Sequence, residues 1–261
     1  MGSFPTYFFA FPLNVILAVI MVIAVASLYA NAPKSLFVRF MLSRSATILS
    51  LTLFLGICLV IGFTGNRELV QSWIFIIIVF NLLTVLLFVI LRGWRRRNSN
   101  GVVIVRWRFL LLHLGLLLAL GSGFWGAPDS RTLRLQLFEG TQSNEAYQMD
   151  GKSVWLPYQI CLNGVEIDTW DNGVPSYTAA NIVVDGKEVT VSVNHPYTKR
   201  LGEDIYITAY GDAEDGHRAY CILQIVKEPW KYGMAAGIFM LLAGALLLFL
   251  NGPRGTIIKE E

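Results

Sequence analysis

Five runs of apolar residues, each close to 20 residues long, constrain the fold of this chain more than any other feature. About 20 apolar residues in a helix cross the hydrocarbon of a bilayer, and a helix leaves no backbone group unpaired there. Charged residues make up only 15% of the chain, whereas soluble domains carry about 25%. The sequence therefore predicts an α-helical membrane protein with about five transmembrane helices, at residues 12–30, 46–65, 73–91, 109–126 and 232–250.

Lysines and arginines predict the orientation of these helices, because cytoplasmic connections carry an excess of positive charge. The second connection holds only Arg67, whereas the first and third hold Lys34, Arg39 and Arg44, and Arg92, Arg95, Arg96, Arg97, Arg106 and Arg108. We therefore expect the N-terminus outside and the C-terminus, with Arg254 and Lys259, in the cytoplasm. The third connection could also bind an anionic lipid or a carboxylate-bearing ligand, although fixing the orientation is the simpler interpretation.

The segment between the fourth and fifth runs, residues 127–229, has a different character. It carries 8 Lys and Arg against 15 Asp and Glu, a net charge of −7, and its apolar residues alternate as in half-buried strands. Asp185-Gly186 between two such strands predicts a tight hairpin. We expect an extracytoplasmic all-β domain, a sandwich or an open barrel, inserted between helices at 1–126 and a final helix with a short cytoplasmic tail at 230–261.

The fourth run, Arg108 to Gly126, contains a histidine among leucine, glycine and alanine. On a helix its small residues form a stripe that allows another helix to approach closely: Gly115, Ala119, Ser122, Gly123 and Gly126. His113 lies about 200° away from Gly115 and so points elsewhere. An ionisable residue in a membrane helix indicates a functional site, and a neutral imidazole can be an axial ligand of haem iron. The alternative is a hydrogen bond from His113 to a neighbouring helix.

The last run repeats this pattern of small residues, since Gly233, Gly237 and Gly244 share one helical face. This could be a packing edge, or it could reflect the general frequency of glycine in membrane helices.

The remaining histidines and the cysteines give weaker signals. His195 precedes a proline and is expected in a turn, and His217 in an exposed hairpin. Three cysteines without a CxxC motif argue against a zinc site or a redox pair. We expect Cys58 to fill space in a helix, and Cys161 and Cys221 to be buried free thiols on outer strands.

The order of the segments resembles the ResB (CcsB) family of System II cytochrome c biogenesis. A helix containing FLLLHLGLLLAL leads into GAPDSRTLRLQLFEG and a strand-rich domain, and the chain leaves that domain through IVKEPWKYGMAAGIFMLLAGALLLF. The resemblance covers most of the chain from about Arg106 onward, and the earlier helices more loosely.

The resemblance implies a cytochrome c biogenesis subunit in the inner membrane of a bacterium. With a CcsA-type partner it would carry haem b across the membrane and present it for attachment to apocytochrome c. His113 matches the transmembrane histidine that such proteins use as an axial haem ligand. Attachment would need the partner, so this chain would be part of a holocytochrome c synthase without being catalytic alone. Membrane lipid is a further expected partner, and nucleic acid is not. The alternative is a non-catalytic membrane scaffold whose outer β-domain binds a protein without haem.

Overall fold

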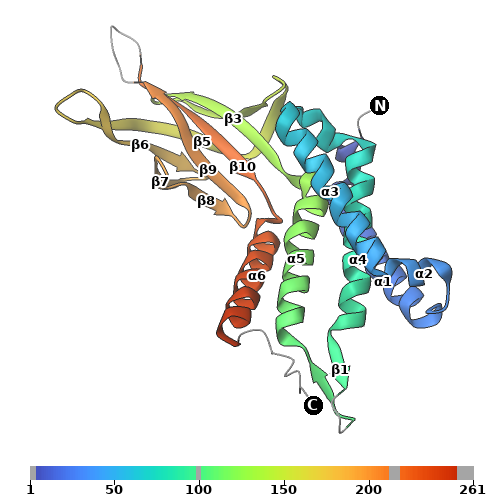
Figure 1. The fold of residues 1–261 in the computed structure, drawn as a ribbon. Helices are drawn as coiled ribbons and strands as arrows, with labels where there is room; N and C mark the ends of the chain where they lie inside the picture. The colour runs from blue at the N-terminus through green and yellow to red at the C-terminus, as the bar shows by residue number, and fades with distance from the viewer. Residues whose placement is uncertain (1–3, 98–100, 212–217, 252–261) are drawn as a thin grey trace. The chain divides into compact units, whose positions relative to one another are not determined.

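The computed structural model describes residues 4–97, 101–211 and 218–251 (Figure 1). The chain divides into two compact units, one formed by residues 1–128 with 230–261 and the other by residues 129–229. Three residues discussed above, His217, Arg254 and Lys259, lie outside the described residues.

The first unit is helical, and its five long helices begin and end within two residues of the predicted runs. They are α1 (Leu13–Asn31), α3 (Arg44–Thr64), α4 (Trp73–Gly93), α5 (Trp107–Gly126) and α6 (Lys231–Asn251). All five are long and apolar enough to cross a membrane, so the prediction of about five such helices is confirmed. The sequence patterns did not predict the short elements, which are η1 (Thr6–Phe9), α2 (Leu36–Met41), η2 (Arg67–Gln71), η3 (Ala127–Asp129), β1 (Arg95–Arg97) and β2 (Val103–Val105).

Local side-chain chemistry explains where the helices begin and end. The Ser43 hydroxyl accepts a hydrogen bond from the Ala46 amide at the start of α3, and Ser72 does the same for Phe75 at the start of α4. Such caps satisfy backbone N–H groups that a first turn leaves unpaired. Gly65 ends α3 in the left-handed conformation, with φ of 64°, which glycine adopts without a steric penalty.

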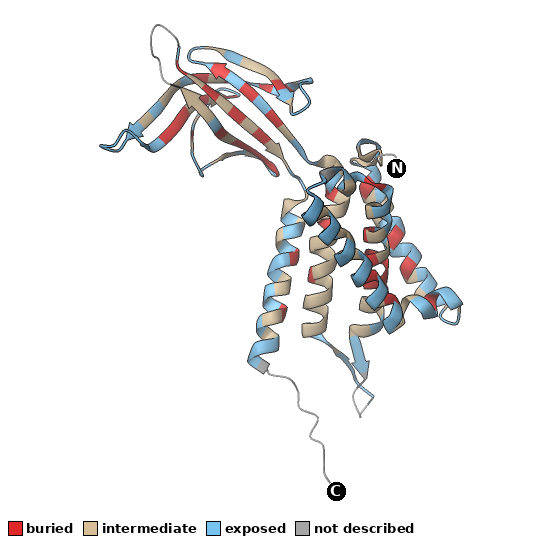
Figure 2. Cartoon of the chain, turned by 45° about the horizontal axis from the view of Figure 1, so that its top comes forward, coloured by how far each residue is buried: buried red, intermediate tan, exposed pale blue. Residues whose placement is uncertain are grey.

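Helix α4 lies at the centre of the helical unit, and buried positions line its middle part, from Val79 to Phe88 (Figure 2). Two polar contacts join the helices around it. The Asn81 amide of α4 donates to Ser50 of α3 at 2.7 Å, and the buried Asn14 amide of α1 donates to the Trp125 carbonyl of α5 at 2.8 Å. Buried amides need such partners, so these bonds fix how the helices align.

Helices α5 and α6 make the closest helix contact, through the glycines predicted to pack. A Cβ atom added at Gly115 would lie 2.8 Å from the carbonyl oxygen of Gly237 and 2.9 Å from the amide nitrogen of Leu241. A Cβ atom at Gly237 would lie 2.6 Å from the Gly115 oxygen. The two small-residue stripes therefore face each other, and the packing interpretation of both is confirmed.

The second unit is one antiparallel sheet in the order β7-β6-β5-β4-β3-β10-β9-β8. The strands are β3 (Arg131–Phe138), β4 (Gln142–Gln148), β5 (Ser153–Thr169), β6 (Pro175–Val184), β7 (Lys187–Ser192), β8 (Tyr197–Arg200), β9 (Glu203–Gly211) and β10 (Tyr220–Lys227). Buried positions alternate along several strands, so one face of the sheet encloses a single core (Figure 2).

The sheet curls until its two ends approach each other. Val191 of β7 and Ile205 of β9 belong to the same buried core, and β7 lies beside β9. The edge strands β7 and β8 are joined by residues 193–196 without a regular ladder of backbone bonds between them. We call this line the seam; an ion pair between Lys199 and Asp185 crosses it. Of the two predicted architectures, the open barrel describes this sheet.

The strand predictions hold except at polar segments. Asp185 and Gly186 have φ of 50° and 77°, so the predicted tight hairpin is confirmed. β4 has a polar sequence and β8 is only four residues long, so neither has the alternation that marks a strand. β5 continues to Thr169, and its second half is one strand of a two-stranded arm with β6.

Candidate functional site

His113 lies in the second turn of α5, and its ring is held by the helix itself. Its Nδ1 lies 2.9 Å from the carbonyl oxygen of Phe109, one turn earlier. A carbonyl oxygen only accepts hydrogen bonds, so Nδ1 donates and the neutral ring keeps a lone pair on Nε2. Metal-binding histidines commonly have this arrangement, with one ring nitrogen donating to a carbonyl and the other free to bind.

Two further side chains lie on the same side of α5. The Phe109 and His113 rings are stacked, with centroids 3.9 Å apart and an angle of 24°. The Arg106 guanidinium lies over the Phe109 ring, with its central carbon 4.9 Å from the ring centroid. Spacings of three, four and seven residues place all three on one side of a helix. We call Arg106, Phe109 and His113 the imidazole face.

The imidazole face and the glycine stripe point in different directions. Phe109 packs against Gly93 at the end of α4, where an added Cβ would overlap its ring, whereas Gly115 contacts α6. Arg106 also donates a long hydrogen bond of 3.3 Å to the Gly93 carbonyl. His113 is half-buried and lies six residues after Trp107, about 9 Å along the helix axis.

The kind of ligand that His113 could hold follows from its neighbours. Among the described residues, no group of three or more His, Cys, Asp or Glu side chains could hold a metal ion. A bare ion at His113 would therefore find fewer than three such side chains among the described residues. Haem iron needs only axial ligands, because the porphyrin supplies four nitrogens. A single histidine such as His113 is therefore enough to serve as one axial ligand of a haem.

The other histidine that the structure describes is a turn residue, as the sequence indicated. The backbone N–H of His195 donates to Ser192 at 3.0 Å, and the side chain is exposed. Its position between β7 and β8 gives it no metal-binding neighbours among the described residues.

The three cysteines are free thiols. Cys221 is buried, and burial raises the pKa of its thiol to about 12, so it stays protonated at neutral pH. Cys161 is only half-buried, because its strand position faces the outer side of the sheet. Cys58, expected as a small apolar filler in a helix, is exposed on α3 and fills no space in the buried core.

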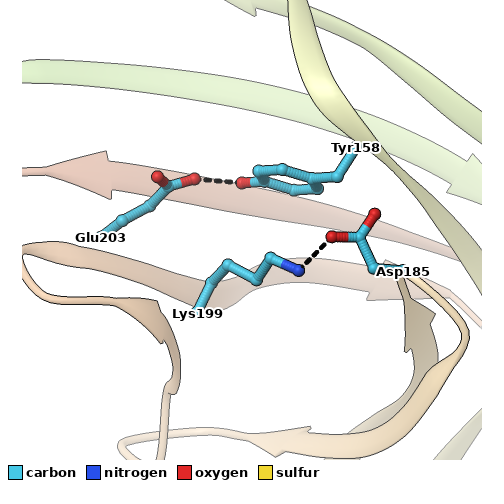
Figure 3. A network of polar contacts seen from close by, with 4 residues as sticks. All are labelled: Tyr158, Asp185, Lys199 and Glu203. Carbon is cyan, nitrogen blue, oxygen red and sulfur yellow. Dashed lines mark hydrogen bonds and ion pairs between the residues drawn. The ribbon is translucent and has the colours of Figure 1, made fainter.

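A polar network inside the β unit was not predicted from the sequence (Figure 3). The Tyr158 hydroxyl donates to the Glu203 carboxylate, whose second oxygen lies 3.9 Å from the Lys227 amine. Lys199 lies 5.0 Å above the Tyr158 ring and pairs with Asp185. Burial, and then the bond to Glu203, raise the pKa of Tyr158 well above its ordinary value.

These contacts join four strands and the β6–β7 turn, and each polar group has a partner. Tyr158 remains a protonated donor, so the network stabilises the barrel interior and does not resemble a catalytic site. Only the inward position of Tyr158 in an alternating strand could have pointed to it.

Comparison with known proteins bears on residues 103–227, which match the sequence model of the ResB-like family. This region begins just before α5 and ends with β10, so it includes His113 and the whole open barrel. The resemblance drawn from the sequence is thereby confirmed, and the ResB-like family implies involvement in cytochrome c biogenesis. No curated protein matches the chain.

Proposed function

With residues 103–227 belonging to the ResB-like family, we propose that this chain carries haem b across the membrane with a CcsA-type partner and presents it to apocytochrome c. The observation that carries the proposal is the geometry of His113. Its Nδ1 hydrogen bond to Phe109 fixes the tautomer and leaves Nε2 as a neutral nitrogen donor. Haem, when bound, supplies the group that becomes attached to the cysteine thiols of the cytochrome.

The imidazole face provides two kinds of contact for such a ligand. The Phe109 ring beside His113 offers an apolar surface to the porphyrin, and Arg106 offers a guanidinium that can bind a propionate carboxylate. His113 is the sole histidine in the helical part of the sequence, so the second axial ligand would come from the partner. The chain therefore holds haem without attaching it alone.

The proposed orientation follows the charges. We place the helices in a bacterial inner membrane, with β1 and β2 in the cytoplasm and residues 127–229 outside. His113 then lies about 9 Å from the cytoplasmic start of α5, a depth suited to haem entering from inside. Labelling in intact cells tests this: a membrane-impermeant thiol reagent should modify Asn172→Cys but not Arg96→Cys, in a background without Cys58 and Cys161. The reverse pattern would overturn the orientation and leave the His113 proposal standing.

The alternative, a haem-free scaffold, also has an observation in its favour. Stacking on Phe109 and the Nδ1 bond could hold His113 purely as a packing residue. The two functions differ in whether Nε2 binds iron.

Absorption spectra of the protein purified with its partner decide between them. The wild type should show a haem Soret band. In His113→Ala the amount of bound haem should fall by about tenfold or more, because losing an axial ligand costs at least as much affinity as losing a residue that only supports a ligand. His113→Gly should regain part of the band when imidazole is added, whereas His195→Ala should keep it. A complex without a Soret band would favour the scaffold, whereas a His113→Ala complex with full haem and full cytochrome c maturation would make His113 a packing residue only.

A further inference from the structure

The helical unit contains a large recess that is separate from the imidazole face. Its volume is about 1030 Å³, and its walls come mainly from α1, α4 and the second half of α5, with contributions from η1 and α6. Its floor reaches the buried core, including Met21, Val25, Val79 and Phe88. His113 is not among the residues that line it.

The walls of the recess are almost entirely apolar. None of the described side chains that line it is ionisable, and its polar side chains are Thr6, Gln71 and Thr84. The Thr84 hydroxyl already donates to the Phe80 carbonyl at 2.8 Å. Thr6 and Gln71 lie near one end, because the neighbouring Phe4 amide donates to the Gln71 carbonyl at 2.6 Å. The recess is thus apolar along its length and polar at one end.

Aromatic rings surround the polar end. Phe4 stacks on Phe9 with centroids 4.7 Å apart and meets Trp73 edge-on at 4.8 Å. Tryptophan collects where a membrane meets water, so Trp73 indicates that this end lies at the depth of the lipid headgroups. The lining continues along α4 from Trp73 to Phe88, about 22 Å of helix, which is most of the roughly 30 Å hydrocarbon thickness.

These properties exclude haem as the occupant. Its propionates would have no cation among the described lining residues, and its iron would have no imidazole. An uncharged hydrocarbon chain suits the walls, because burying it costs no desolvation of charge. A polar group attached to that chain would meet Thr6 and Gln71 at the interface.

From this match we infer that the recess binds one acyl chain of a membrane phospholipid, with the headgroup at the Thr6 and Gln71 end. The chain follows α1 and α4 inward and fills space that the helices leave open. The bound lipid is a component of the folded helical unit. This inference does not depend on the proposed role in haem transfer.

Two glycines on α5 offer a matched test. Gly123 lines the recess, and a Cβ there meets only the flexible end of Met234 at 3.4 Å, whereas a Cβ at Gly121 meets nothing within 4 Å. Gly123→Leu therefore fills the recess with little effect on the backbone, and Gly121→Leu adds the same bulk on the same helix elsewhere. Ala24→Phe fills the recess from a second helix, α1, which guards against a folding defect in one variant.

The full chain is reconstituted in phosphatidylethanolamine and phosphatidylglycerol vesicles, re-extracted in detergent and washed, and the retained phospholipid is measured by mass spectrometry. Wild type and Gly121→Leu should keep phospholipid, and both recess variants should lose several-fold more of it. Equal retention in all four proteins would overturn the inference. So would recess variants that keep their lipid but lose a co-purifying membrane protein, since the occupant would then be a partner helix.

Discussion

The two sides of α5 differ in how fully this chain supplies their contacts. On the glycine side, Gly115 meets Gly237 of α6 at backbone distance, and both surfaces belong to this chain. On the imidazole side, Phe109 contacts α4, but His113 directs a ring nitrogen that has no hydrogen-bond partner within the described residues. Both sides lie on one rigid helix, so the first can position the second.

The difference shows how the sequence separates structural from functional positions. Small residues allow close packing without polar chemistry, and their cost is conformational, not electrostatic. A histidine at membrane depth carries a desolvation cost that packing alone does not require. The glycine side thus provides stability, and the imidazole side carries the residues on which the proposed function rests.

The largest effect on this comparison is expected from Gly237→Leu. Its side chain would overlap the backbone of Gly115 and Ala119, which cannot move aside as a flexible side chain can. We expect the free energy of unfolding to fall by about 3 kcal/mol or more, which is at the upper end of the effects of overpacking. Thermal unfolding in detergent would measure it, with Gly56→Leu on α3 as control, because that position has nothing within 4 Å. Equal stability of the two variants would show that the α5–α6 contact is not tight.

A smaller effect is expected on the imidazole side from Arg106→Gln. Under the proposed function, removing the guanidinium deletes a charge-assisted bond to a haem propionate, worth about 1.5–3 kcal/mol, so the affinity for haem should fall by about tenfold to a hundredfold. Haem titration of the purified complex would measure it. Arg96→Gln makes the same charge change on the exposed strand β1 and should have little effect. Equal losses in both variants would assign the effect to net charge and not to the imidazole face.

The smallest effect is expected from Gly121→Ala, which touches neither side. Its added methyl group meets nothing within 4 Å, and alanine favours a helix over glycine by about 1 kcal/mol or less. Thermal stability should stay unchanged or rise slightly, whereas Gly115→Ala should lower it. A loss of stability in Gly121→Ala would mean that α5 has a third packing side.

Much of the fold follows from patterns with a strong physical basis. Helix boundaries were predictable because membrane spans need continuous apolar length, and β6 and β7 because alternation flanks Asp185-Gly186. β4 was not predictable from its sequence, because its side chains are mostly polar and only its backbone pairing, with β3 and with β5, makes it a strand. His113 could be selected as a candidate from its type and depth. The contacts of Phe109 with His113 and with Arg106 were not predicted, because helical spacing permits such contacts but does not specify them.

The seam of the barrel has a kinetic consequence. Neighbouring strands elsewhere are held by ladders of backbone bonds, but across the seam the contacts are made by side chains such as Lys199 and Asp185. Side-chain ion pairs weaken with salt, whereas backbone ladders open only with the strands they join. Local opening of the barrel should therefore begin along β7 and β8. Backbone amide protons in these strands should exchange with solvent sooner than those of β3 and β10.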